Sequence, residues 1–308
     1  MNGYLAAGVA VVIWAAYPVA TRAGVTGSFA PQELVTLRFG VGALLFLPYL
    51  LLQFRTIGRK AWLQGVPLMV FQGAGMGALV IWGLQLAPAN HQAALGPGVN
   101  LAWVALLGFL VFARKPSARL VVGALLCASG VLLIAWWSVS ERNASVLAGD
   151  AMFLAASALG AFYVLQLRSW GVGAIQGAAI VTVYSAMVVV PWYFWSSPEP
   201  LWRVAPLELL WQILWQGVLI GCVAFIALNH AISKLGAERS SAMVALVPVL
   251  SASLALVFLG EVPSPAEIAA FLAISAGVSI AASRHYAGSP AATSAPIKRS
   301  ACGLSRPG

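Results

Sequence analysis

The sequence predicts an all-α integral membrane protein with ten transmembrane helices in two inverted five-helix repeats. Of the 308 residues, 61% are hydrophobic and 8% are charged, and the mean hydropathy is +0.91, whereas about a quarter of the residues of soluble domains are charged. Residues 61–113 contain no Asp, Glu, Lys or Arg, and this run exceeds one crossing of about 20 residues. Weak similarity between the two halves is the third observation.

Stretches without acids or bases give the helices in order. The first has no basic segment before it, unlike a signal peptide, so we expect it to be retained. The ten predicted helices cover residues 3–24, 31–53, 62–86, 89–112, 118–139, 149–168, 175–196, 207–233, 238–259 and 265–283.

The charges between these helices predict the topology. If the N-terminus is cytoplasmic, most Lys and Arg residues fall in cytoplasmic connections, as the positive-inside rule requires. Of the acids, Glu238 alone falls on that side. We therefore predict a multi-pass protein of the inner (plasma) membrane with both termini cytoplasmic. Residues 284–308 combine Pro, Gly and Ser with basic residues, which predicts a disordered basic cytoplasmic tail.

An offset of 147 residues aligns parts of the two halves. It places Pro263-Ser264 on Pro116-Ser117 and Gly277-Val278 on Gly130-Val131. We predict one five-helix repeat at residues 1–140 and a second at 141–283. Because five is odd, the repeats are inverted in the membrane, an arrangement associated with alternating access. Two such halves supply a complete pathway, so we expect a monomer.

Several function classes are not expected. Cys127, Cys222 and Cys302 have no paired spacing for a metal or a disulfide. The basic residues flank the spans rather than forming a nucleic-acid-binding face. An enzyme would need clustered carboxylates, paired His residues or a metal site. We therefore predict no enzyme activity, no cofactor, no metal and no nucleic acid, with the bilayer and a small solute as partners. A channel remains an alternative to a carrier.

The first helix offers candidate substrate-binding residues. Trp14 and Tyr17 share a helical face, and Pro18 removes a backbone donor there. The alternative is that these aromatic side chains lie at the membrane interface. Tyr163 is the counterpart of Tyr17 in the second half at an offset of 146 residues.

The third and fourth helices add polar and aromatic candidates. Gln72 is an amide within an apolar span, and Trp82 follows it on the same predicted helix. Asn100 and Trp103 share one face of the fourth helix and could contact the polar head and flat body of a zwitterion. The alternative for Asn100 is a hydrogen bond between helices, which contributes about 1 kcal/mol.

The remaining candidates lie near helix ends and breaks. His91 is a candidate substrate contact or outer gate, with a hydrogen-bonded structural residue as the alternative, and Asn229 is its possible inner counterpart. Arg38 lies within the second helix, where we favour a structural partner such as a helix C-terminus or Glu33 over a substrate carboxylate. The predicted hinge or gate residues are Pro18, Gly96, Pro97, Gly98 and Pro248.

The distribution of acids bears on energy coupling. No Asp or Glu falls in the middle of a predicted span, whereas proton and cation antiporters usually place a carboxylate there. We therefore expect facilitated or weakly coupled transport of a net-neutral solute.

These features resemble the drug/metabolite transporter superfamily, EamA type, over residues 3–283. The motifs that carry the resemblance are Trp14-Ala-Ala-Tyr17-Pro18, Arg38-Phe39, Gly149-Asp150, and Pro248 followed by Gly260-Glu261. The narrower similarity is to YddG-type exporters, which implies export of aromatic and other largely neutral amino acids. Drug or metabolite export and flipping of a lipid-linked intermediate are alternatives within the superfamily. One departure is Leu101, which stands where the symmetric half has Pro248.

Overall fold

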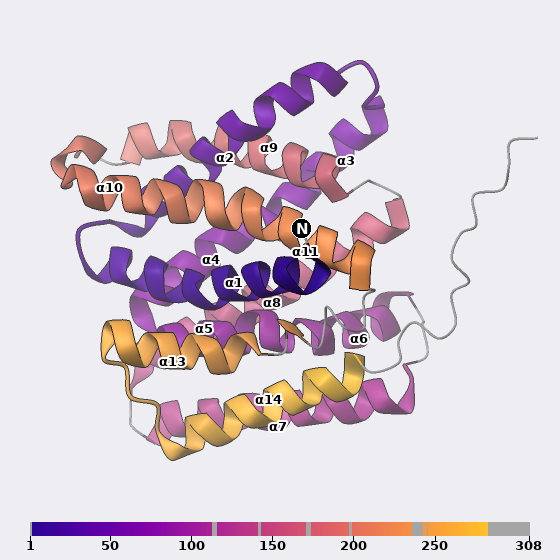
Figure 1. Cartoon of the computed structure of the whole chain (residues 1–308), viewed down its shortest axis with the longest axis vertical. Coiled ribbons are helices and arrows are strands. Elements are labelled where there is room, and N and C mark those ends of the chain that lie inside the picture. The colour runs from indigo at the N-terminus through magenta and orange to yellow at the C-terminus, as the bar shows by residue number, and fades with distance from the viewer. Residues whose placement is uncertain are drawn as a thin grey trace, which may run out of the picture.

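The computed structural model is a bundle of helices that lie side by side (Figure 1). It describes residues 2–112, 116–140, 143–170, 174–196, 199–235, 243–244 and 246–282, and all regular elements in these ranges are helical. Eight helical segments of the described chain are long and apolar enough to cross a membrane, and two shorter apolar helices follow. The predicted tail and most of the start of the predicted ninth helix lie outside these ranges.

The elements follow the predicted segments closely along the chain. In order they are α1 Gly3–Thr26, α2 Pro31–Gln53, α3 Arg59–Gln72, α4 Ala74–Leu86, α5 Ala89–Ala93, η1 Ala94–Gly98, α6 Val99–Phe112, α7 Ala118–Ser140, α8 Ala144–Trp170, α9 Ala174–Ser196, η2 Leu201–Arg203, α10 Pro206–Gln212, η3 Ile213–Val223, α11 Ala224–Leu235, α13 Val247–Leu259 and α14 Pro265–Ala282. The all-helical membrane fold is thereby confirmed. The count of ten spans and the inverted repeats remain predictions.

The predicted third helix is not continuous, which corrects the sequence-based expectation. Gly73 ends α3 with a non-helical backbone, and α4 starts at the next residue. Ser185 of α9 accepts a hydrogen bond from the Ala74 amide at 2.9 Å. A side chain at Gly73 would collide with the Ser185 hydroxyl. The break therefore depends on close approach to α9, because lipid offers no partner for a free amide.

Two π-helical stretches interrupt longer helices. The first, η1, contains Gly96, Pro97 and Gly98, so the predicted break in the fourth helix is present as a local change of helical type. Ser157 of α8 donates a hydrogen bond to the Gly96 carbonyl at 2.7 Å. The second stretch, η3, spans 11 residues and was not expected from the sequence. Such stretches occur often at functional sites.

The helix α8 begins at Ala144, five residues before its predicted start. Asn143 precedes it and accepts hydrogen bonds at its side-chain oxygen from the Val146 amide and the Ser145 hydroxyl. This is the usual role of Asn at a helix N-cap. As a result Asp150 lies in the second turn of the helix, inside the bundle.

The helices α7 and α14 pack along each other at one edge of the bundle (Figure 1). Glycines allow this close approach. A Cβ atom added at Gly277 would lie 2.6 Å from the Gly123 carbonyl oxygen and 2.8 Å from Cys127 Sγ. The backbones of α7 and α14 are therefore in direct contact through these small residues.

We predict that Gly277→Ala lowers the stability of the protein in detergent by about 1–3 kcal/mol, because the new methyl group meets backbone that cannot move away. Thermal unfolding would measure this. Gly108→Ala in α6 is the matched control, since nothing lies within 4 Å of the added Cβ. Equal melting temperatures for the two variants would contradict the close packing of α7 on α14.

Candidate functional site

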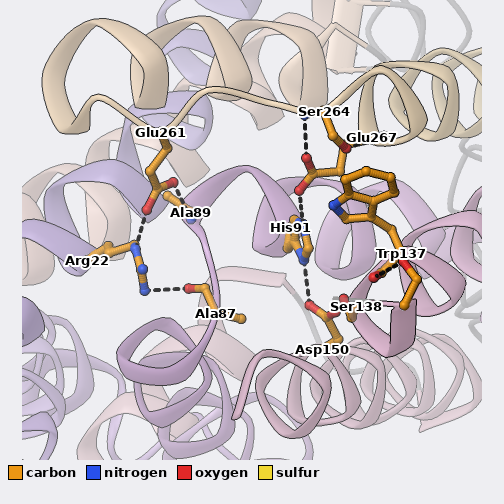
Figure 2. Close-up of polar contacts among 11 residues, drawn as sticks. Arg22, Ala87, Ala89, His91, Trp137, Ser138, Asp150, Glu261, Ser264 and Glu267 are labelled. Carbon is orange, nitrogen blue, oxygen red and sulfur yellow. Dashed lines mark hydrogen bonds and ion pairs between the residues drawn. The ribbon is translucent and has the colours of Figure 1, made fainter. Parts of the chain in front are cut away.

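Most of the buried charge lies at one end of the bundle, where α1 ends and α5, α8 and α14 begin. We call it the Arg22 end. There His91 of α5 lies between two carboxylates (Figure 2). Its Nδ1 is 2.8 Å from Asp150 Oδ1 of α8, and its Nε2 is 2.5 Å from Glu267 Oε1 of α14. The exposed fractions are 1% for His91, 3% for Asp150 and 7% for Glu267. His91 therefore links three helices away from solvent.

Both carboxylates have second partners that hold them in place. The Ser138 hydroxyl of α7 donates to Asp150 Oδ2 at 3.0 Å. Glu267 accepts from the Ser264 amide at 2.6 Å, and the Ser264 hydroxyl accepts from the Glu267 amide at 3.2 Å. This reciprocal pair is a capping box. The start of α14 thus positions Glu267 against the imidazole.

A second ion pair at the same end joins Arg22 of α1 to Glu261, which follows α13 (Figure 2). The Arg22 Nη1 also donates to the carbonyl oxygens of Leu84 at 2.7 Å and Ala87 at 2.6 Å. Glu261 accepts from the Ala89 amide at 2.9 Å. Both side chains are partly buried. This pair closes the connection between α4 and α5 against α1 and α13.

A third group at the Arg22 end lies nearer the surface. Arg203 of η2 donates to Glu33 of α2 through both terminal nitrogens, at 2.7 and 3.1 Å, and its Nε lies 2.7 Å from Glu199. The hydrogen bond to Glu33 is the main reason that the pKa of Arg203 is raised above its ordinary value, against a smaller lowering by partial burial. The guanidinium stays charged and fixes the start of α2.

One sequence-based interpretation is corrected by these contacts. Glu33 pairs with Arg203 and not with Arg38, because Glu33 at the start of α2 faces η2. The sequence also did not indicate that two of the acids near helix starts are buried. Asp150 and Glu267 are buried and paired, because their helices begin inside the packed end of the bundle.

Arg38 instead contacts Tyr17 of α1. Its Nη1 donates to the Tyr17 hydroxyl at 2.5 Å, and the guanidinium carbon lies 5.1 Å from the centre of the Tyr17 ring. Tyr17 is buried. The predicted lining residue of α1 is therefore next to a cation within the bundle.

The predicted residues Gln72 and Asn100 come together around Gly160 of α8. A Cβ atom at Gly160 would lie 3.2 Å from Asn100 Nδ2, 3.5 Å from Gln72 Oε1 and 3.5 Å from Met76 Sδ. Asn100 Nδ2 also donates to the Ser157 carbonyl at 3.1 Å. Two amides from α3 and α6 thus face one point on α8.

The other predicted lining residues are more dispersed. Trp103 borders an apolar groove of about 490 Å³ between α6 and α7, and its buried indole nitrogen has no hydrogen-bond partner among the residues that the structure describes. Trp82 packs against Trp192 with ring centroids 6.0 Å apart. Tyr163 is buried in an apolar cluster with Leu68.

Trp14 packs against a small cluster that contains Ala93 and Val247. Asn229 belongs to α11, but its side chain lies outside the part of the chain that the structure describes.

Of the predicted hinge residues, Pro18 lies inside α1 and Pro248 lies in the first turn of α13. Neither position ends its helix. Their role in movement remains a prediction.

Within the described residues no group of three or more His, Cys, Asp or Glu side chains is arranged to hold a metal ion. Sequence reasoning singled out His91 but missed its partners. The Ser264–Glu267 spacing of a capping box was visible in the sequence, whereas nothing local marks Asp150 as the partner of a residue 59 positions earlier.

The fold and its buried polar contacts define a multi-pass helical membrane protein. The EamA-like transporter family matches residues 1–136 and 147–283. The chain therefore belongs to the EamA-like transporter family and is a membrane transporter of the drug/metabolite transporter type, a family whose members are not enzymes. A solved crystal structure of a protein with 22% sequence identity aligns over 91% of this chain and 96% of the chain in that structure, at a TM-score of 0.60. This similarity supports the fold and nothing further. No curated protein matches the sequence.

Proposed function

We propose that this protein exports amino acids across the inner membrane by alternating access, and that the Arg22 end is its outer gate. One observation supports the gate above all. Each ion-pair group at this end joins the proposed first repeat to the second: Arg22 to Glu261, His91 to Asp150 and Glu267, and Glu33 to Arg203. If two inverted repeats rock against each other, these pairs must separate whenever the Arg22 end opens.

The substrate proposal depends on the chemistry of the interior and on the resemblance described above. Tyr17, Trp103 and the amides at Gly160 offer flat apolar surface together with polar groups. This combination suits a flat solute with a small polar head. Aromatic and other largely neutral amino acids have that form.

We also propose that transport runs down the substrate gradient with weak coupling or none. One reason is that no Asp or Glu falls in the middle of a predicted span. Asp150, Glu267 and Glu33 are buried, but each is engaged by a cationic side chain or an imidazole at the Arg22 end. They therefore serve the gate better than a coupling site in the middle of the bundle.

Transport by the purified protein in liposomes tests the proposal. We expect saturable uptake and counterflow of an aromatic amino acid without a pH difference, and no comparable uptake from a panel of cationic dyes. Strict dependence on a proton gradient would contradict the coupling proposal. Transport of dyes or of lipid-linked sugars in place of amino acids would favour the other functions of the superfamily, and flux that does not saturate would indicate a channel.

A further inference from the structure

One face of α1 carries two polar contacts a single turn apart. Tyr17 receives a hydrogen bond from Arg38 of α2 at 2.5 Å. Thr21, which is fully buried, accepts one from Gln216 of η3 at 2.9 Å. Helices α1, α2 and η3 pack on one another here. We call three of these side chains the α1 site: Tyr17, Arg38 and Gln216.

Arg38 carries a positive charge but forms no ion pair with a described carboxylate. It lies seven residues from the start of α2, about 10 Å into the helix at 1.5 Å per residue. None of the carboxylates that the structure describes forms an ion pair with it, and the buried ones have partners at the Arg22 end. The tyrosine hydroxyl and ring stabilise the guanidinium but leave its charge uncompensated. A charged side chain at this depth is costly and usually serves a function.

The side-chain oxygen of Gln216 is a hydrogen-bond acceptor to which no described residue donates. Gln212 donates from Nε2 to the Ala20 carbonyl at 2.8 Å, so its Oε1 is left to accept from Gln216 Nε2 at 3.3 Å. This contact determines which way the Gln216 amide points. Its Oε1 then has no hydrogen-bond partner among the described residues, although the side chain is 0% exposed. An unpaired buried oxygen of this kind is destabilising unless a ligand or water donates to it.

From these two groups we infer that the α1 site recognises the zwitterionic head of an α-amino acid. The substrate carboxylate binds the Arg38 guanidinium, which presents parallel donors suited to two carboxylate oxygens. The substrate ammonium donates to Gln216 Oε1. Arg38 is then a selectivity residue for solutes that carry a carboxylate, and this assignment rests on the proposed function.

The test compares three solutes that share an indole ring: tryptophan, its decarboxylated amine tryptamine, and the des-amino acid indole-3-propionate. We expect the wild-type protein in liposomes to take up tryptophan at least about tenfold faster than either analogue. The reason is that losing a buried charged partner weakens binding about tenfold or more. Arg38→Gln should slow tryptophan uptake about tenfold or more and leave tryptamine uptake unchanged. Arg38→Lys should restore part of the preference for tryptophan.

The ammonium contact has its own pair of variants. Gln216→Met should slow tryptophan uptake and leave indole-3-propionate unaffected. Thr21→Val is the matched control, because it removes the hydrogen bond from Gln216 Nε2 and keeps the Oε1 acceptor; it should preserve the preference for tryptophan. If Thr21→Val loses that preference as fully as Gln216→Met, packing and not the acceptor is responsible.

Two outcomes would overturn the inference by itself. The first is that the wild-type protein transports tryptophan and the Arg38→Gln variant keeps the same preference for tryptophan over the two analogues. The other is an equal loss of all three solutes in a variant with a wild-type melting temperature. If Arg38→Gln does not fold, thermal stabilisation of the wild-type protein by the three solutes decides, and equal shifts contradict the site. A wild-type protein that moves no amino acid fails the proposed function and this site with it.

Discussion

His91→Ala is expected to lower the stability of the protein by about 3–5 kcal/mol, because removing one partner of a buried charged group leaves the others uncompensated. Asp150 and Glu267 would remain buried with only Ser138 and Ser264 as partners. Thermal unfolding of the detergent-solubilised protein measures the loss. Transport should fall with it, because the Arg22 end loses its most buried contact between the proposed repeats.

The control is a mutant cycle that separates electrostatics from packing. Asp150→Asn and Glu267→Gln together remove the negative charges and keep side chains of similar shape. In that background His91→Ala should cost about 2 kcal/mol less than in the wild type, since no buried carboxylate is left unpaired. The same cost in both backgrounds would show that His91 acts only by filling space.

The sequence predicts the fold well because the composition of each membrane-spanning segment reflects the lipid that surrounds it. Apolar length and the absence of charge mark the segments, and the boundaries fall where charge or proline returns. The breaks are harder to predict. Gly73 can interrupt the helix because the Ser185 hydroxyl, more than a hundred positions later, accepts a hydrogen bond from the freed Ala74 amide. No local sequence pattern indicates that contact.

The site shows the same limit. The sequence identifies His91, Asn100 and Tyr17 as candidates because polar groups in apolar segments are energetically unfavourable and are easily recognised. Their partners did not, since Asp150 and Glu267 look like ordinary acids near helix ends. Only the position of His91 between Asp150 of α8 and Glu267 of α14 reveals that these acids are buried and paired. The EamA resemblance is confirmed, whereas the amino acid substrate and the YddG-type likeness remain proposals.

Arg22→Ala is expected to shift the protein toward a state that is open at the Arg22 end. The substitution removes the pair with Glu261 and the two hydrogen bonds to Leu84 and Ala87. A hydrogen bond to a charged group contributes about 1.5–3 kcal/mol. A loss of that size changes the ratio of closed to open molecules on the order of ten- to a hundredfold.

A cysteine at position 90 can report this change. Asn90 is 2% exposed, and its side-chain oxygen has no partner in the described part of the chain, so Asn90→Cys removes none of the described hydrogen bonds of that atom. In a protein whose native cysteines are replaced, a membrane-impermeant maleimide should label this position slowly in the closed state. Labelling should accelerate about tenfold or more when Arg22→Ala is added.

Glu261→Gln and Glu261→Ala separate the charge from the geometry. Arg22 and the Ala89 amide donate to different oxygens of the Glu261 carboxylate, so the single amide oxygen of Gln can keep one of these two bonds, whereas Ala keeps neither. Labelling should therefore rise less for Gln than for Ala, for which we expect at least about a tenfold increase, since a neutral hydrogen bond retains part of the contribution of a charged one. Equal labelling of both Glu261 variants at the wild-type rate would mean that this end is held closed by helix packing, and that the ion pair is not part of a gate.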